Sequence, residues 1–147
     1  MTPVPLRVLF LCTGNSARSQ MAEALLNLMG HGRFHAESAG SHPAPRVNPH
    51  AIRALAEIGI SWQGHAPRGI EGLTREHWDL IITVCDNARE ACPVFPGHPT
   101  FAHWRLADPA EVQGTEQARQ RAFAATRDLL ARRIGQLLVE PRAQQAP

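Results

Sequence analysis

The segment 12–19 combines a possible nucleophile with possible anion donors. Five residues separate Cys12 from Arg18; a short apolar run precedes the segment and a helical pattern follows it. A loop of this length can turn successive main-chain N–H groups toward one point, where the start of the helix adds its dipole. Gly14 permits a positive φ angle, and Arg18 offers a planar fork of donors. We therefore predict a tetrahedral oxyanion site at Thr13, Gly14, Asn15, Ser16, Ala17, Arg18 and Ser19, and call residues 12–19 the anion loop.

The same field should act on the thiol of Cys12. A free cysteine has a pKa near ~8.5, and a helix N-terminus or a nearby cation lowers it to roughly 3.5–7.5. With Arg18 nearby and Ser19 able to donate to the sulfur, we predict that Cys12 is a thiolate at neutral pH and attacks the bound anion. The alternative is an inert cysteine at the end of a core strand. The order of strand, cysteine, five-residue gap, arginine and helix favours the nucleophile.

Asp108 is the candidate proton donor. Displacing an oxygen from a tetrahedral anion needs an acid, because hydroxide and alkoxide leave poorly, and such an acid contributes about 10²–10⁴-fold in rate. The segment Asp108-Pro109-Ala110-Glu111 is equally typical of a helix start, with Asp at the cap, Pro in the first turn and Glu three residues after the Asp. The residues alone leave both interpretations open.

Cys85 and Cys92 form a second pair of thiols. Cys85 ends an apolar run, so its sulfur should emerge at the same edge of a parallel sheet as Cys12. If the segment between the two is helical, their Cα atoms are roughly 10 Å apart, whereas a disulfide needs about 4.4–6.8 Å. A bridge would require that segment to deform. The alternatives are an inert structural pair and half of a zinc site, although the six-residue gap is a poor zinc spacing.

The elements that must position these residues alternate between strands and helices. Apolar runs predict strands over 7–12, 34–38, 79–84 and 100–104; helical patterns follow the anion loop, run over 49–57, and extend from 115 to about 139. Thr74 can cap a short helical turn. This alternation predicts an α/β fold: a single-domain three-layer α/β/α structure with a four-stranded parallel sheet. We expect the domain to span residues 1–140 and residues 141–147 to form a flexible tail.

Composition excludes several classes of function. The chain has 147 residues, 44% of them hydrophobic and 19% charged, which suits one globular domain. A net charge of +2, with no basic cluster, gives no reason to expect nucleic acid. No apolar run is long enough for a membrane span, and no signal peptide is evident. We expect a cytoplasmic monomer with reduced thiols.

The string CTGNSARSQMAE, with Ser38-Ala39-Gly40 downstream, resembles the arsenate reductases built on the low-molecular-weight protein tyrosine phosphatase fold. The likeness runs from Arg7 to about the end of the long helix. It implies that fold, reduction of arsenate to arsenite for arsenic detoxification, and Asp108 as the general acid. Phosphate and sulfate would compete with arsenate, and no cofactor would be bound.

The resemblance also implies a relay of three thiols. Cys12 would attack arsenate, Cys85 would attack Cys12 and expel arsenite, and Cys92 would then attack Cys85 and free Cys12. The resulting disulfide would be reduced by thioredoxin. Glutaredoxin and a low-molecular-weight thiol are the other electron donors to consider.

Two alternatives to the reductase differ in class. A low-molecular-weight tyrosine phosphatase would share Cys12, Arg18 and Asp108, and would use aromatic residues to stack on its substrate. Here Ala110-Glu111 follow the Asp-Pro pair and the chain has no Tyr. We therefore expect phosphatase activity to be only a weak side activity of the reductase. The second alternative, a non-catalytic oxyanion-binding module, is not favoured by a chain with both nucleophile and acid.

Some members of the resembled family bind a potassium ion beside the anion loop. Asn15, Glu23 and Ser38 match positions around that site. A further acidic residue is expected near Arg68, and the arginine there argues against the ion. We therefore predict no metal, and potassium at Asn15, Glu23 and Ser38 stays open as the alternative.

Overall fold

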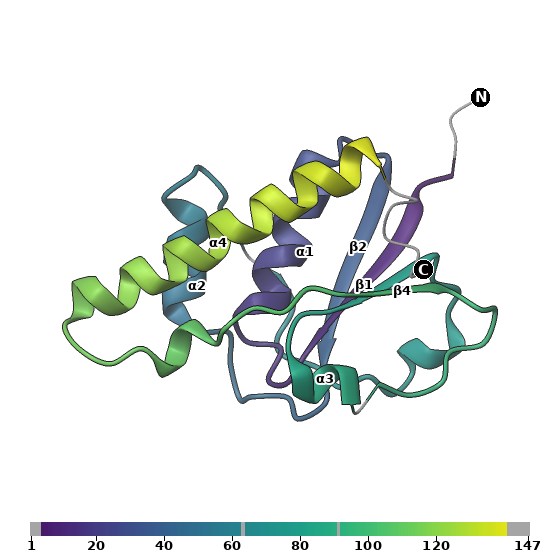
Figure 1. Ribbon diagram of the computed structural model, residues 1–147, viewed down its shortest axis with the longest axis horizontal. Coiled ribbons are helices and arrows are strands. Elements are labelled where there is room, and N and C mark those ends of the chain that lie inside the picture. The colour runs from purple at the N-terminus through teal and green to yellow at the C-terminus, as the bar shows by residue number, and fades with distance from the viewer. Residues whose placement is uncertain (1–3, 63, 91, 141–147) are drawn as a thin grey trace.

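Four parallel strands form the sheet, in the order β2-β1-β3-β4 (Figure 1). The computed structural model describes residues 4–62, 64–90 and 92–140. The strands are β1 (Leu6–Cys12), β2 (Phe34–Gly40), β3 (Leu80–Thr83) and β4 (Thr100–His103). Their carboxyl ends therefore meet at one edge of the sheet, where β1 leads directly into the anion loop.

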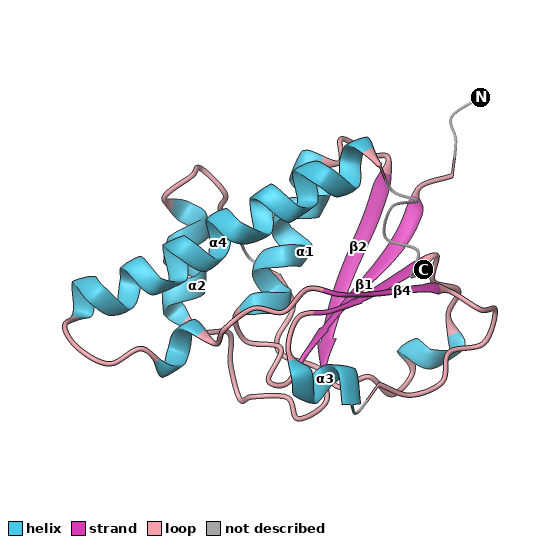
Figure 2. Cartoon of the chain, viewed as in Figure 1, coloured by secondary structure: helices cyan, strands magenta, loops and turns pink. Residues whose placement is uncertain are grey.

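The helices cover both faces of this sheet. They are α1 (Arg18–Met29), α2 (Pro49–Ala56), α3 (Asp86–Glu90) and α4 (Glu116–Val139), with two 3₁₀ turns, η1 (Leu73–Arg75) and η2 (Pro109–Glu111). On one side α1 packs on β1 and β2, and α4 crosses α1 and α2. Figure 2 shows η1 on the other side and the short α3 beside the carboxyl ends of β1 and β3. The predicted three-layer α/β/α fold is confirmed, with one thick and one thin helical layer.

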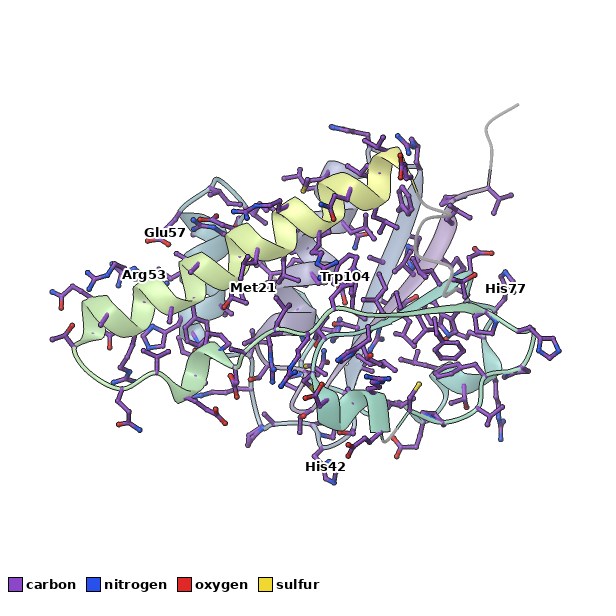
Figure 3. All side chains as sticks on the ribbon, in the orientation of Figure 1. Met21, His42, Arg53, Glu57, His77 and Trp104 are labelled. Carbon is purple, nitrogen blue, oxygen red and sulfur yellow. The ribbon has the colours of Figure 1, made fainter. Side chains whose placement is uncertain are left out.

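Apolar side chains gather between these layers. Residues 8–11 of β1 are fully buried, as expected for a central strand covered on both faces. The inward face of α4 follows helical spacing and carries Phe123, Leu130, Ile134 and Leu137, each at most 1% exposed. Figure 3 shows Met21 and Trp104 near the centre of the molecule, with the exposed Arg53, Glu57 and His77 at its periphery.

The predicted boundaries hold to within two residues, and the two main helix starts have physical caps. Asn48 accepts the N–H of His50 ahead of α2, and Thr115 accepts the N–H of Ala118 ahead of α4. The prediction that Thr74 caps a turn is wrong. Thr74 lies inside η1, and Gly72 precedes that turn with a φ angle of 88°.

Strand β2 continues to Gly40, two residues beyond its predicted end. There it passes so close to the anion loop that a Cβ on residue 40 would collide with the carbonyl oxygen of Thr13. Within the described residues, no helix is long and apolar enough to span a membrane. The predicted tail, 141–147, lies outside the described residues.

Candidate active site

The anion loop turns its carbonyl groups outward. Four of them accept N–H groups from the segment 41–48, which connects β2 to α2. These carbonyls belong to Cys12, Thr13, Gly14 and Ser16, and they bind the N–H groups of Ser41, His42, Ala44 and Asn48 at 3.1, 2.8, 2.9 and 2.8 Å. In a trans peptide the N–H points opposite to the carbonyl. The N–H groups that follow these carbonyls therefore face the inside of the loop, as an anion site requires.

The sulfur of Cys12 lies within this ring of donors. Asn15 N–H donates to Cys12 Sγ at 3.1 Å, and Ser19 Oγ lies 2.8 Å from the sulfur. Asn15 Nδ2 donates to Ser19 Oγ at 2.8 Å, which leaves the hydroxyl proton of Ser19 free to donate to the sulfur. Asn15 reaches both partners from a left-handed conformation with φ of 51°. The donors around Cys12 thus suit a sulfur anion.

Burial opposes that effect. Cys12 is 2% exposed, and burial raises the pKa of its thiol above the usual value, while hydrogen bonds from Ser19 and Asn15 and the charge of Arg18 act in the opposite direction. The net direction is upward. The prediction of a Cys12 thiolate at neutral pH is therefore not confirmed by this structure.

Arg18 links the anion loop to the Asp108 loop. Its guanidinium donates to the carbonyl of Leu106 at 2.9 Å and lies 3.9 Å from Asp108 Oδ2. Asp108 also caps η2, because its Oδ1 accepts the N–H of Ala110 at 2.9 Å. The helix-start interpretation is thus correct for a 3₁₀ turn. The same carboxyl group faces the anion loop, where it is placed to act as an acid.

A cavity of about 520 Å³ opens between these groups. Its lining includes Thr13, Arg18, Cys85, Asp86, Arg105 and Asp108. Cys85 reaches it from the end of β3 and is held there by the anion loop, because Thr13 Oγ1 lies 3.2 Å from Cys85 Sγ. The N–H of Ala88 in α3 donates to the same sulfur at 3.4 Å. The structure therefore brings a second thiol to the site of the first.

Cys92 follows α3 in the chain. It is half-buried, its sulfur lies 3.6 Å from the carbonyl oxygen of Pro93, and burial raises the pKa of its thiol. It lines a separate cavity of about 790 Å³. All three cysteines are free. Because α3 occupies residues 86–90 between Cys85 and Cys92, we expect that a bridge between them requires α3 to unwind.

A clamp on the start of α3 was not predicted. His103, at the end of β4, lies 2.7 Å from Thr83 Oγ1 through Nδ1 and 3.0 Å from Asp86 Oδ1 through Nε2. Arg105 lies 3.7 Å from the other oxygen of Asp86. The signal for this clamp is the register of the sheet, which pairs Thr83 with His103. This contact can be predicted only once β3 and β4 are known to be neighbours in the sheet.

Metal ligation finds no support in the described residues. Across 4–62, 64–90 and 92–140, no group of three His, Cys, Asp or Glu side chains could hold a metal ion. The zinc alternative for Cys85 and Cys92 therefore lacks its further ligands among these residues.

Comparisons with known proteins agree with this geometry. The family profile described as low molecular weight phosphotyrosine protein phosphatase matches residues 7–146. An arsenate reductase of Bacillus subtilis (strain 168) is 37% identical over 127 residues, which are 86% of this chain and 91% of the relative.

Two solved structures are similar over most of the chain. The arsenate reductase from Archaeoglobus fulgidus has a TM-score of 0.67 and 36% identity, covering 87% of this chain and 98% of its own. A thioredoxin-dependent arsenate reductase of Corynebacterium glutamicum has a TM-score of 0.64 and 29% identity, covering 92% of this chain and 64% of its own. With the anion loop at the end of β1 and the profile match over nearly its whole length, the chain belongs to the low molecular weight phosphotyrosine protein phosphatase family.

Proposed function

We propose that this protein reduces arsenate to arsenite through a relay of Cys12, Cys85 and Cys92 and thereby detoxifies arsenic. The observation that carries the proposal is the second thiol: Cys85 is held 3.2 Å from the hydroxyl of Thr13, inside the anion loop. Phosphate-ester hydrolysis needs one nucleophile and one acid. The named relatives support the reductase, since arsenate reductases are similar to this chain over most of its length.

In the first step Cys12 attacks arsenic. An S–As bond forms, an As–O bond breaks, and the displaced hydroxyl leaves as water. Asp108, beside Arg18, supplies the proton for that oxygen and recovers one from the thiol of Cys12, directly or through the substrate. Arg18 and the N–H groups that follow the carbonyls of Cys12, Thr13, Gly14 and Ser16 offset the negative charge of the bound oxyanion.

In the second step the thiolate of Cys85 attacks Cys12 Sγ. The electron pair of the S–As bond stays on arsenic, which leaves as arsenite, and a Cys12–Cys85 disulfide forms. Cys92 then attacks Cys85 Sγ, so that Cys12 is released as a thiolate and the disulfide passes to Cys85 and Cys92. We propose thioredoxin as the dithiol that reduces this last disulfide, because one similar reductase is described as thioredoxin-dependent. These steps suit a cytoplasmic location, where thiols are kept reduced.

Steady-state turnover tests the relay. Arsenate is supplied with thioredoxin, thioredoxin reductase and NADPH, and NADPH oxidation is followed for the wild type, Cys85→Ser and Cys92→Ser. Both variants should lose arsenate turnover and keep slow hydrolysis of an aryl phosphate, which needs Cys12 and Asp108. Full arsenate turnover by Cys92→Ser would refute the three-thiol relay.

Thiol counting tests the first half alone. One equivalent of arsenate, added to reduced protein without thioredoxin, should remove two of the three thiols. The Cys12→Ser variant is the matched control and should lose none. Loss of no thiols from the wild type, combined with rapid aryl phosphate hydrolysis, would assign the protein to the phosphatase function of its family.

A further inference from the structure

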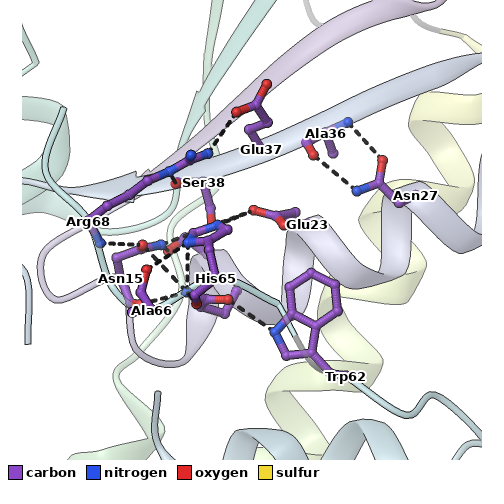
Figure 4. Close-up of polar contacts among 12 residues, drawn as sticks. Asn15, Glu23, Asn27, Ala36, Glu37, Ser38, Trp62, His65, Ala66 and Arg68 are labelled. Atoms are coloured by element: carbon purple, nitrogen blue, oxygen red, sulfur yellow. Dashed lines mark hydrogen bonds and ion pairs between the residues drawn. The ribbon is translucent and has the colours of Figure 1, made fainter. Parts of the chain in front are cut away.

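Behind the anion loop lie the three residues that match a potassium site in some members of the family (Figure 4). Asn15 Nδ2 donates to Ser38 Oγ at 2.9 Å, and Ser38 Oγ donates to Glu23 Oε1 at 2.8 Å. All three side chains are buried. The residues therefore gather at one place, and whether they suit a cation depends on what else binds their oxygen atoms.

Those oxygen atoms already have protein donors. The Arg68 main-chain N–H donates to Asn15 Oδ1 at 3.0 Å, and Arg68 Nε donates to the carbonyl of Ser38 at 3.0 Å. His65 Nε2 lies 2.8 Å from Glu23 Oε1. A hard cation binds oxygen lone pairs and would compete with these donors. The acidic residue expected near position 68 is a guanidinium instead, which repels a cation. This cluster does not fit potassium.

We propose that Arg68 takes the place of an inorganic cation and holds the anion loop in its working shape without potassium. Arg68 is a positioning residue that acts through Asn15. Asn15 has a left-handed conformation, which asparagine adopts more readily than most residues with a Cβ. In this conformation the Asn15 N–H reaches Cys12 Sγ at 3.1 Å. The hydrogen bond from Arg68 to the Asn15 side chain therefore helps to fix the Asn15 main-chain N–H as a donor to Cys12 Sγ.

Arg68 is itself fixed to the end of β2 at three points. Its Nε binds the carbonyl of Ser38, its terminal nitrogen binds Glu37 Oε1 at 2.8 Å, and its carbonyl accepts the N–H of Gly40 at 2.9 Å. These contacts aim the remaining donor, the main-chain N–H, at Asn15 Oδ1 (Figure 4). Because a guanidinium stays charged at every accessible pH, this support is permanent, whereas a bound ion would dissociate.

Thermal unfolding in different salts tests the proposal without any turnover, so its failure is separate from failure of the reductase assignment. The wild type is melted in equal concentrations of potassium, sodium and choline chloride. We expect the same Tm in all three. A rise of the wild-type Tm that is specific to potassium would overturn the proposal.

An acidic residue introduced at position 68 should make the Tm depend on potassium. Arg68→Asp is expected to gain a Tm increase in potassium chloride relative to choline chloride, because a carboxylate then joins the oxygens that Arg68 had occupied. Arg133→Asp, with the same charge change on the exposed face of α4, should gain none. A folded Arg68→Asp protein that does not respond to potassium would overturn the proposal.

A milder variant covers the case in which Arg68→Asp does not fold. Arg68→Met keeps the main-chain N–H but loses the anchors to Ser38 and Glu37. Inorganic phosphate, titrated calorimetrically in choline buffer, should bind about tenfold more weakly to it, the factor expected for one lost charge-assisted hydrogen bond. Arg133→Met should bind phosphate like the wild type. Unchanged phosphate affinity in Arg68→Met would show that Arg68 does not position the loop.

Discussion

Ser19→Ala tests how the anion loop controls the nucleophile. The Ser19 hydroxyl lies 2.8 Å from Cys12 Sγ and is itself held by Asn15 Nδ2 at 2.8 Å. A hydrogen bond to a charged partner contributes about 1.5–3 kcal/mol. Because the thiolate needs this bond more than the thiol does, its removal should lower the thiolate population at a fixed pH by about tenfold to a hundredfold.

The assay is alkylation of Cys12 by iodoacetamide as a function of pH. It is run in a Cys85→Ser, Cys92→Ser background so that a single thiol reacts. Burial raises the pKa of Cys12, so the alkylation rate should climb toward its plateau at a pH above the usual range for a cysteine. Ser19→Ala removes a contact that lowers this pKa, so its midpoint should move to still higher pH. Comparing midpoints, each relative to its own plateau, separates ionisation from access to the sulfur.

Ser41→Ala is the matched control. The main-chain N–H of Ser41 binds the carbonyl of Cys12, but its hydroxyl contacts His42 and not the sulfur. Its alkylation midpoint should equal that of the parent. An unchanged or lower midpoint in Ser19→Ala would refute the role of the hydroxyl. A parent midpoint below that of free cysteine would show that the donors outweigh burial.

Other substitutions test the supports of the site. Gly40→Ala should weaken phosphate binding in calorimetry, because its Cβ meets the Thr13 carbonyl, and it should cost about 1–3 kcal/mol in urea unfolding; wild-type values in both would contradict the close approach. His103→Gln removes the imidazole that lies 3.0 Å from Asp86 Oδ1, so amide exchange in α3 should quicken by about tenfold with little change in α4. Leu130→Ala empties a fully buried position and should lower the free energy of unfolding by about 2–5 kcal/mol, measured in urea.

The sequence predicts the fold well where local pattern decides it. The runs at β1 and β3 are almost continuously apolar, so their burial and parallel pairing follow directly. The end of β2 escaped prediction because Gly40 carries no side chain to extend an apolar pattern. Its place in the strand depends on contacts with the anion loop and with Gly69.

In the candidate site too, local features could be predicted from the sequence and long-range contacts could not. The spacing from Cys12 to Arg18 is local and could be read from the chain. The contact of Arg68 with Asn15 joins residues 53 apart in the chain, and the sequence around each of them does not predict it. The pKa of Cys12 depends on both kinds of contact: its donors lie within seven residues, whereas the burial that opposes them comes from the whole fold.

The length of α3 reconciles two opposed demands of the proposed relay. At rest, Cys85 must stay beside Thr13 and away from Cys92; later, Cys92 must reach it. A helix of five residues is far below the roughly 12–15 at which an isolated helix becomes stable, so α3 depends on its contacts. One of these, the Ala88 N–H to Cys85 Sγ, involves the reacting sulfur itself. In the proposed relay, a bond from Cys85 to Cys12 would draw that sulfur toward the anion loop and weaken this contact. In the proposed relay, formation of the first disulfide would thus loosen α3, while the contact of His103 with Asp86 would oppose premature unwinding.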